Sequence, residues 1–187
     1  GVFPTPSLCK RIKQLEINEA ILDGDELIAA CLSSQQIQRL IDDVEIEQLD
    51  AAPPDNEVEI LRITRLWDII RHNDRELRAD FALMTAGRKS QPISASNRII
   101  GAENIFLEEG VEMEFCTLNA TTGPIYIGKN TLLMEGCLLR GPIAIMDEAI
   151  LKMGAKIYGP TTIGPGCRAG GEITRTILTA NCNKARE

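Results

Sequence analysis

Isoleucine or leucine recurs at every sixth residue through the second half of this chain. Seven consecutive positions obey the spacing: Ile127, Leu133, Leu139, Ile145, Leu151, Ile157 and Ile163. A mostly small side chain follows each of them four residues later: Thr131, Cys137, Ile143, Ala149, Ala155, Thr161 and Cys167. The dipeptides Gly123-Pro124, Gly141-Pro142 and Gly159-Pro160 stand 18 residues apart. A period of six nested within 18 predicts a coil with three flat sides.

Strand geometry predicts which residues of each hexad point inward and how the coils stack. Each hexad supplies one short strand whose first and fifth residues point inward. Successive coils then stack in parallel, about 4.8 Å apart, so that residues separated by 18 positions lie over one another. The predicted interior ladders are Ile127 with Ile145 and Ile163, Leu133 with Leu151, and Leu139 with Ile157.

Ile-Gly pairs begin at residues 100, 127 and 163. With the hexads, they resemble the left-handed parallel β-helix of hexapeptide-repeat transferases, whose coil hand departs from the usual right-handed crossover rule. The predicted fold class is therefore mainly β. A left-handed β-helix over residues 97–187, cut short at its carboxyl end, follows a small α/β segment over residues 1–90, and residues 87–92 connect the two.

The α/β segment carries shorter patterns of its own. Asp23-Gly24-Asp25-Glu26 lies between two apolar runs and has the turn chemistry of a β-hairpin. Ser7 is a candidate N-cap for a first helix, and Ser33 or Ser34 for a second. The predicted elements are a helix over residues 7–16, a hairpin over 20–30, a helix reaching Ile41, a strand over 58–63, and one or two helices over 66–85.

Charge and composition exclude several classes of protein. The chain has 27 acidic and 20 basic residues, and no basic face for nucleic acid emerges. No apolar run approaches the roughly 20 residues of a membrane-spanning helix, and no signal peptide opens the chain. These features predict a cytoplasmic protein without membrane or nucleic-acid partners. Cysteine spacing gives no zinc motif, and Cys137 and Cys167 are expected to be buried thiols on different sides of the coil.

The repeat slips once, because Leu107 precedes Ile127 by 20 residues. Asn119-Ala120-Thr121-Thr122 is therefore expected to bulge outward from one coil. Loops at such corners often build ligand sites, although insertions are also what a solenoid tolerates most easily. The insertion alone does not decide between these two roles.

Several segments resemble a GlmU-like family of sugar nucleotidyltransferases, related to glucose-1-phosphate thymidylyltransferase and N-acetylglucosamine-1-phosphate uridyltransferase. The matching segments are residues 23–29, 81–84, 87–92, 100–101, 105–110 and 152–165. The resemblance implies transfer of a nucleotide from a nucleoside triphosphate to a sugar 1-phosphate, with release of pyrophosphate. It also implies that Mg²⁺ neutralises the triphosphate. The chain itself shows no metal ligand set.

The chain departs from that family at one decisive point. A Gly-rich loop that continues through an Arg to a Pro-Lys pair is expected near the amino terminus, where its backbone amides cradle phosphates. No such segment occurs, and Thr85-Ala86-Gly87-Arg88-Lys89 has one glycine and no following Pro-Lys. We expect the chain to be a fragment in which residues 1–90 form the carboxyl-terminal part of the nucleotidyltransferase domain. Such a fragment would be inactive by itself.

Two alternatives remain open at this stage. Acyl-CoA-dependent acyltransferases of the hexapeptide class bind their donor between subunits of a trimer and use a histidine base. The only histidine, His72, lies outside the hexads. Alternatively, the β-helix is a non-catalytic scaffold that forms a homotrimer through flat apolar faces carrying Met134, Met146 and Met153.

Outward positions of the coils supply the candidate binding residues. Arg140 and Tyr158 are expected to stack one coil apart, and Lys152 with Lys156 adds positive charge suited to a sugar phosphate or the phosphates of CoA. Asn181, Asn183 and Lys184 offer further donors near the end of the chain. The competing interpretation is a cation on an aromatic face with ordinary surface lysines. No catalytic residue is predicted.

Overall fold

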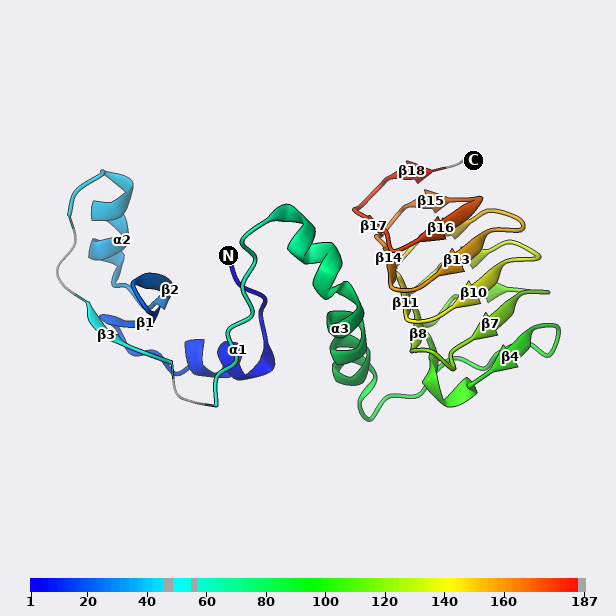
Figure 1. The fold of residues 1–187 in the computed structure, drawn as a ribbon, viewed down its shortest axis with the longest axis horizontal. Coiled ribbons are helices and arrows are strands. Elements are labelled where there is room, and N and C mark those ends of the chain that lie inside the picture. Colours follow the sequence, from blue (N-terminus) through cyan, green and yellow to red (C-terminus); the bar gives the residue numbers. More distant parts are fainter. Residues whose placement is uncertain (46–48, 55–56, 185–187) are drawn as a thin grey trace. The chain divides into compact units, whose positions relative to one another are not determined.

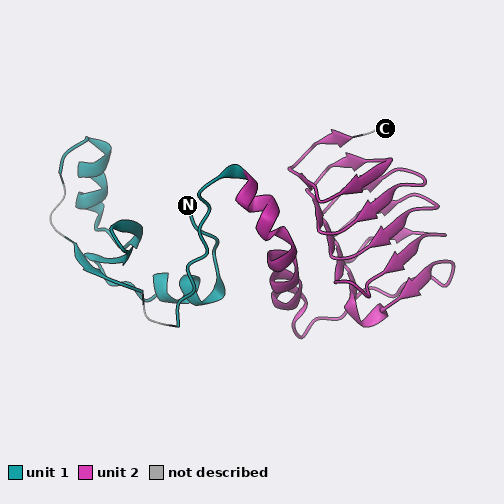
Figure 2. Ribbon diagram, in the orientation of Figure 1, with its two compact units in different colours: residues 1–66 teal, residues 67–187 magenta. Residues whose placement is uncertain are grey.

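The computed structural model describes residues 1–45, 49–54 and 57–184. It divides into two compact units, residues Gly1–Leu66 and Trp67–Glu187 (Figure 2). The boundary near residue 90, predicted between the nucleotidyltransferase-like segment and the β-helix, stays a prediction.

The first unit is a small α/β arrangement. Its three-stranded sheet has the order β2-β1-β3, with β1 antiparallel to β2 and parallel to β3. The elements are α1 (Pro6–Ile12), β1 (Glu19–Asp23), β2 (Glu26–Ala30), α2 (Ser34–Ile41) and β3 (Asp50–Ala52). The predicted hairpin and the second helix are therefore confirmed.

Several details of this unit differ from the sequence prediction. Helix α1 ends at Ile12 instead of reaching residue 16, and β3 was not predicted. Thr5, rather than Ser7, is the N-cap of α1, because its hydroxyl accepts from the backbone amide of Leu8. The strand expected over residues 58–63 does not form, and Arg62 makes only an isolated bridge to Val2. Apolar alternation favours a strand, but a strand also needs a partner with a free edge. The cap of α2 was predicted correctly, since Ser33 and Gln36 form a reciprocal capping box.

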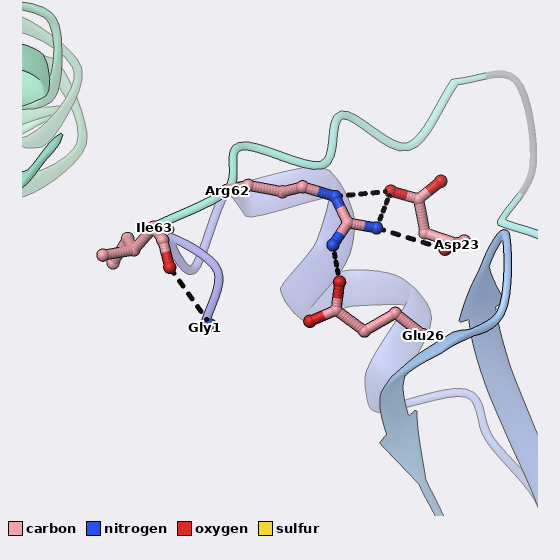
Figure 3. A network of polar contacts seen from close by, with 5 residues as sticks. All are labelled: Gly1, Asp23, Glu26, Arg62 and Ile63. Carbon is pink, nitrogen blue, oxygen red and sulfur yellow. Dashed lines mark hydrogen bonds and ion pairs between the residues drawn. The ribbon is translucent and has the colours of Figure 1, made fainter. Parts of the chain in front are cut away.

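Arg62 holds the hairpin to the segment that precedes the second unit (Figure 3). Its guanidinium donates through Nε and Nη2 to Asp23 Oδ2, at 3.1 and 2.6 Å, and through Nη1 to Glu26 Oε2. Asp23 ends β1 and Glu26 begins β2. A planar guanidinium that contacts both carboxylates fixes the two ends of the turn together.

The first unit has a small core of its own. Its buried apolar side chains among the described residues are Leu8, Ala20 and Ile21. Helix α2 buries none, and Ile37, Leu40 and Ile41 are 47%, 51% and 71% exposed. Residues of the first unit therefore leave the apolar side of α2 uncovered.

The second unit contains the predicted coil, built from three five-stranded parallel sheets. We name each sheet after its central strand. The β10 sheet contains β4 (Arg98–Ile100), β7 (Thr117–Asn119), β10 (Leu138–Arg140), β13 (Lys156–Tyr158) and β16 (Glu172–Thr174). The β11 sheet contains β5 (Ile105–Leu107), β8 (Ile125–Ile127), β11 (Ile143–Ile145), β14 (Thr161–Ile163) and β17 (Ile177–Leu178). The β12 sheet contains β6 (Glu112–Met113), β9 (Leu132–Leu133), β12 (Ile150–Leu151), β15 (Arg168–Ala169) and β18 (Asn183–Lys184).

Register confirms the ladders. Ile145 pairs with both Ile127 and Ile163, Leu133 with Leu151, and Leu139 with Ile157. All seven small fifth-position residues are also buried, including the thiols of Cys137 and Cys167. The mainly β solenoid is thus the fold that the hexads predict, while its left-handed sense stays a prediction from the family pattern.

The slip in the repeat lies between β7 and β8. Leu118 pairs with Leu139 and Ile127 with Ile145, so nine residues replace the usual six in this segment. One residue is missing before it, since five residues separate Met113 from Leu118, and the net excess is two. Thr121 and Thr122 are exposed, as expected for a bulge. Ala120 instead turns inward and is 1% exposed, because its backbone amide donates to Ile100 of the preceding coil.

Helix α3 (Leu66–Thr85) runs along the outside of the β11 sheet, beside β8, β11 and β14 (Figure 1). Two hydrogen bonds fasten it there. The Thr162 hydroxyl donates to Asn73 Oδ1 at 3.0 Å, and Arg78 Nη2 donates to the Thr122 carbonyl at 2.7 Å. A separate 3-10 turn, Ala102–Asn104, leads into β5.

Two neighbouring leucines of β10 test the inward ladder. Leu139 is 2% exposed and Leu138 is 46% exposed. We expect Leu139→Ala to lower the free energy of unfolding by about 2–5 kcal/mol, because it leaves a cavity between coils. The matched control Leu138→Ala should cost under about 1 kcal/mol. Urea unfolding followed by circular dichroism gives both values, and equal costs would contradict the assigned register.

Candidate functional site

Arg140 and Tyr158 occupy equivalent positions in neighbouring coils. They are directly paired at the carboxyl ends of β10 and β13. The stacking predicted from the sequence is therefore present in the structure. Both side chains are exposed on the outer side of the β10 sheet, where alternate residues point away from the core.

Helix α3 brings a second guanidinium to this corner. Arg78 donates to both carboxylate oxygens of Asp74, through Nε at 3.2 Å and through Nη2 at 3.1 Å. Its Nη2 also donates to the Thr122 carbonyl. The shared cavity, which we call the arginine corner, is about 330 Å³ and is lined by Asp74, Arg78, Thr122, Arg140, Gly141, Pro142, Tyr158, Gly159 and Pro160.

The donors of the arginine corner differ in availability. Arg78 is already engaged by Asp74 and Thr122. No hydrogen bond or ion pair is recorded between the Arg140 guanidinium and any other described residue. Its planar set of donors can therefore meet the oxygens of a phosphate or carboxylate without first breaking an internal bond. The Tyr158 hydroxyl supplies a neutral donor beside it.

The other predicted binding residues divide between two sheets. Lys156 begins β13 and projects from the same outer side as Tyr158, two residues later. Lys152 follows β12, and Asn183 and Lys184 form β18, so these belong to the β12 sheet. Asn181 lies in the turn before β18. The seven residues thus do not form one site, and the predicted cluster of Lys152 with Lys156 is divided by a corner of the coil.

Sequence reasoning missed two members of the arginine corner, Arg78 and Thr122. The spacing of Asp74 and Arg78 is a visible signal for a helical ion pair. That signal does not say which side of the β-helix the helix covers. The Thr122 carbonyl faces Arg78 because the coil carries extra residues after β7, and such a loop has no repeat from which its position can be read.

Arg88, in the segment after α3, contacts residues of the first coils. Arg88 Nη2 donates to Glu108 Oε2 at 2.7 Å, and its guanidinium lies 5.1 Å from the centre of the Phe106 ring. The Tyr126 hydroxyl donates to Glu108 Oε1 at 2.7 Å. Phe106 and Tyr126 stack with ring centres 6.0 Å apart. Arg88 is therefore committed to the first coils.

Electrostatics in this network follow from its contacts. The hydrogen bond from Arg88 lowers the pKa of Glu108 below its ordinary value of 4.5, and the Tyr126 hydroxyl assists. Burial raises the pKa of Tyr126 to about 12, and its bond to the Glu108 carboxylate adds to the shift. Glu108 thus stays ionised and Tyr126 stays protonated near neutral pH.

The residues named for the two alternative functions lie apart. His72 is on α3 and partly buried, outside the strands of the coil. Met146 lines the space beneath α3, while Met153, 69% exposed, lies in the turn between β12 and β13. Met134 follows β9 on the β12 sheet. Met134 and Met153 both follow strands of the β12 sheet, whereas Met146 follows β11, so the three methionines do not share one flat face.

The implied magnesium ion finds no ligand set in the described part of the chain. Across residues 1–45, 49–54 and 57–184, no group of three or more His, Cys, Asp or Glu side chains is placed to hold a metal ion. We therefore derive no step through a metal from these residues. Within the same ranges, no helix is both long and apolar enough to cross a membrane.

Comparison with known proteins agrees with the family resemblance of the first half of the chain. Residues 1–89 match the model of a family described as sugar nucleotidyl transferase. The resemblance to sugar nucleotidyltransferases is thus confirmed for this region, and the parallel β-solenoid that follows agrees with a hexapeptide-repeat β-helix. Searches of the curated proteins and of the solved structures gave no match.

The Glu108 network predicts a specific pH dependence. Because the folded-state pKa of Glu108 is lowered, its contribution to stability is present above the unfolded value of 4.5 and is lost as pH falls through the folded value. Glu108→Gln should therefore flatten the fall in unfolding free energy between about pH 6 and about pH 3.

Denaturant titrations at a series of pH values measure this slope. Glu109→Gln is the matched control, because its exposed side chain has no recorded hydrogen bond among the described residues. That variant should keep the slope of the wild type. A Glu108→Gln variant with an unchanged slope would show that the network does not hold Glu108 in its ionised form.

Proposed function

We propose that this chain is part of a sugar-1-phosphate nucleotidyltransferase-like protein of nucleotide-sugar metabolism. In the full-length protein, a phosphate oxygen of the sugar 1-phosphate attacks the α-phosphorus of a nucleoside triphosphate. The bond between the α-phosphorus and its bridging oxygen breaks, and pyrophosphate leaves as the nucleoside diphosphate sugar forms. The observation that carries this proposal is the family match over residues 1–89.

The 187-residue chain is proposed to be inactive in this reaction. The Gly-rich phosphate loop that the family resemblance requires does not occur in its sequence. The uncovered apolar side of α2, with Ile41 at 71% exposure, supports a role for the first unit within a larger folded domain. Magnesium and the triphosphate would then meet outside the residues described above.

The arginine corner is proposed to hold the phosphate of a sugar phosphate. Arg140 supplies the charge, Tyr158 a neutral donor, and Lys156 a second positive charge on the same sheet. Arg78, held by Asp74, also lines the cavity. Lys152, Asn181, Asn183 and Lys184 are proposed to bind more weakly, because they lie on the β12 sheet.

A homotrimer in the cytoplasm is also proposed. A homotrimer would use the outer sides of the β10 and β12 sheets, since α3 lies along the β11 sheet. Ile100 and Leu138, 49% and 46% exposed on the β10 sheet, offer apolar contacts for it. The cytoplasmic location rests on the sequence. An acyl-CoA-dependent reaction gains no support, because the single histidine lies on α3.

Catalysis is tested by comparing two preparations. We expect the 187-residue chain to release no pyrophosphate from any of the four nucleoside triphosphates with glucose 1-phosphate or N-acetylglucosamine 1-phosphate and Mg²⁺. The gene product isolated from its native source should release it, with an intact mass above 20.5 kDa. A native product of 20.5 kDa without activity would overturn the proposal.

Sugar phosphate binding is tested at Arg140. Calorimetric titration of glucose 1-phosphate into the chain should show binding that Arg140→Gln weakens about 5- to 10-fold, the loss expected for an exposed charge-assisted hydrogen bond. Arg168→Gln is the matched control, since Arg168 is exposed on the β12 sheet. Equal affinity in the wild type and Arg140→Gln would remove the arginine corner from the proposal.

A further inference from the structure

A second cavity lies between α3 and the outer side of the β11 sheet. We call it the α3 cleft. Its volume is about 360 Å³, within the range of small-molecule sites. Helix α3 contributes Asn73, Leu77, Asp80, Phe81 and Met84 to its walls, and the sheet contributes Ala144 and Ile177.

The walls of the cleft are mainly apolar. Leu77, Phe81 and Met84 follow one another at helical spacings of four and three, so they lie along one side of α3. Ala144 projects outward from β11 to face them, and Ile177 lines the cleft from β17. A ligand with an apolar body would remove these surfaces from water.

One polar group in this cleft is unsatisfied. Asn73 is 8% exposed, and its Oδ1 accepts the hydroxyl of Thr162 at 3.0 Å. Its Nδ2 is buried and has no hydrogen-bond partner among the described residues. A buried amide donor without a protein acceptor is rare in folded proteins. A carbonyl or ether oxygen in the cleft would satisfy it.

Charge restricts the ligand further. Among the described residues, the carboxyl side chains that line the cleft are those of Glu76 and Asp80, and no lysine or arginine lines it. Asp80 follows Asn73 by seven residues, or about 10 Å along the helix. Loss of hydration raises the pKa of Asp80. An anion would meet two carboxylates and no compensating cation, so phosphates are disfavoured.

We propose that the α3 cleft binds a neutral small molecule with an apolar chain and a carbonyl oxygen that accepts a hydrogen bond from Asn73 Nδ2. This site is separate from the proposed nucleotidyl transfer, whose substrates are anions. Neither the arginine corner nor the matched region 1–89 needs to act in transfer for this binding to occur.

The test uses three probes with one carbon chain. Hexanamide is neutral and has a carbonyl, hexanoate is anionic, and hexylammonium is cationic. Each is titrated into the complete 187-residue chain while the backbone amide signals of α3 and β11 are followed by nuclear magnetic resonance. Hexanamide should bind with a dissociation constant on the order of 1 mM, as expected for so small a ligand. Hexanoate should bind about 10-fold more weakly, because its carboxylate meets Glu76 and Asp80. Hexylammonium should also bind more weakly than hexanamide, because its head group cannot accept a hydrogen bond from Asn73 Nδ2.

Two variants test the contacts. Asn73→Asp keeps an acceptor for Thr162 and removes the amide donor, and at about pH 8 its carboxyl is ionised. We expect hexanamide to bind it about 10-fold more weakly. Asn104→Asp makes the same chemical change at an exposed position outside the cleft and should bind as the wild type does. Ala144→Phe fills the cleft and should abolish the binding.

Any of three results would overturn the proposal: no saturable shifts with hexanamide in the wild type, hexanoate binding as tightly as hexanamide, or unchanged hexanamide binding in both Asn73→Asp and Ala144→Phe. The probe series on the wild type needs no variant to fold. It therefore decides the matter even where a substitution unfolds the chain. Loss of sugar phosphate binding in Arg140→Gln has no bearing on it.

Discussion

The stacking of identical inward positions from coil to coil is the constraint on which the second unit depends. Ile127, Ile145 and Ile163 lie over one another and are fully buried, so each coil supplies the packing surface for the next. The corners obey a related limit. A Cβ atom on Gly141 would overlap the carbonyl oxygen of Gly123, which explains why glycine recurs there with the 18-residue period. Because interior and corners are fixed in this way, chemical variation is left to the outward side chains.

The outward sides of the three sheets then acquire different chemistry. On the β10 sheet, Arg140, Lys156 and Tyr158 remain exposed. The middle residues of the β11 sheet are apolar or neutral, as with Ala144 and Thr162, and α3 lies over them. A regular scaffold thus carries a cationic surface and a covered apolar surface around the same core. Neither disturbs the other, because they lie on different sheets of the coil.

The sequence predicted correctly the positions that follow the repeat, but it did not predict the contacts of segments outside the repeat. Ladder positions such as Leu139 were correct because a strict period leaves one consistent assignment of inward residues. The pairing of Arg140 with Tyr158 followed from the same period. Arg78 and Asn73 could not be placed, since the amphipathic pattern of α3 does not state which sheet it covers or in which register. The strand expected over residues 58–63 failed for a similar reason: local propensity specifies extended backbone, but strand formation depends on a distant partner.

Helix α3 connects the two cavities of the second unit because neighbouring residues on it point to different sides. Asn73 and Leu77 line the α3 cleft, while Asp74 and Arg78, each one position later, line the arginine corner. One residue corresponds to a rotation of about 100° around a helix, which is enough to separate an apolar site from a cationic one. Both sites also share the attachments of the helix, the Asn73 bond to Thr162 and the Arg78 bond to Thr122. A ligand that shifted α3 against the β11 sheet would therefore move Arg78 relative to Arg140. A ligand that fitted the existing space would leave the arginine corner unchanged.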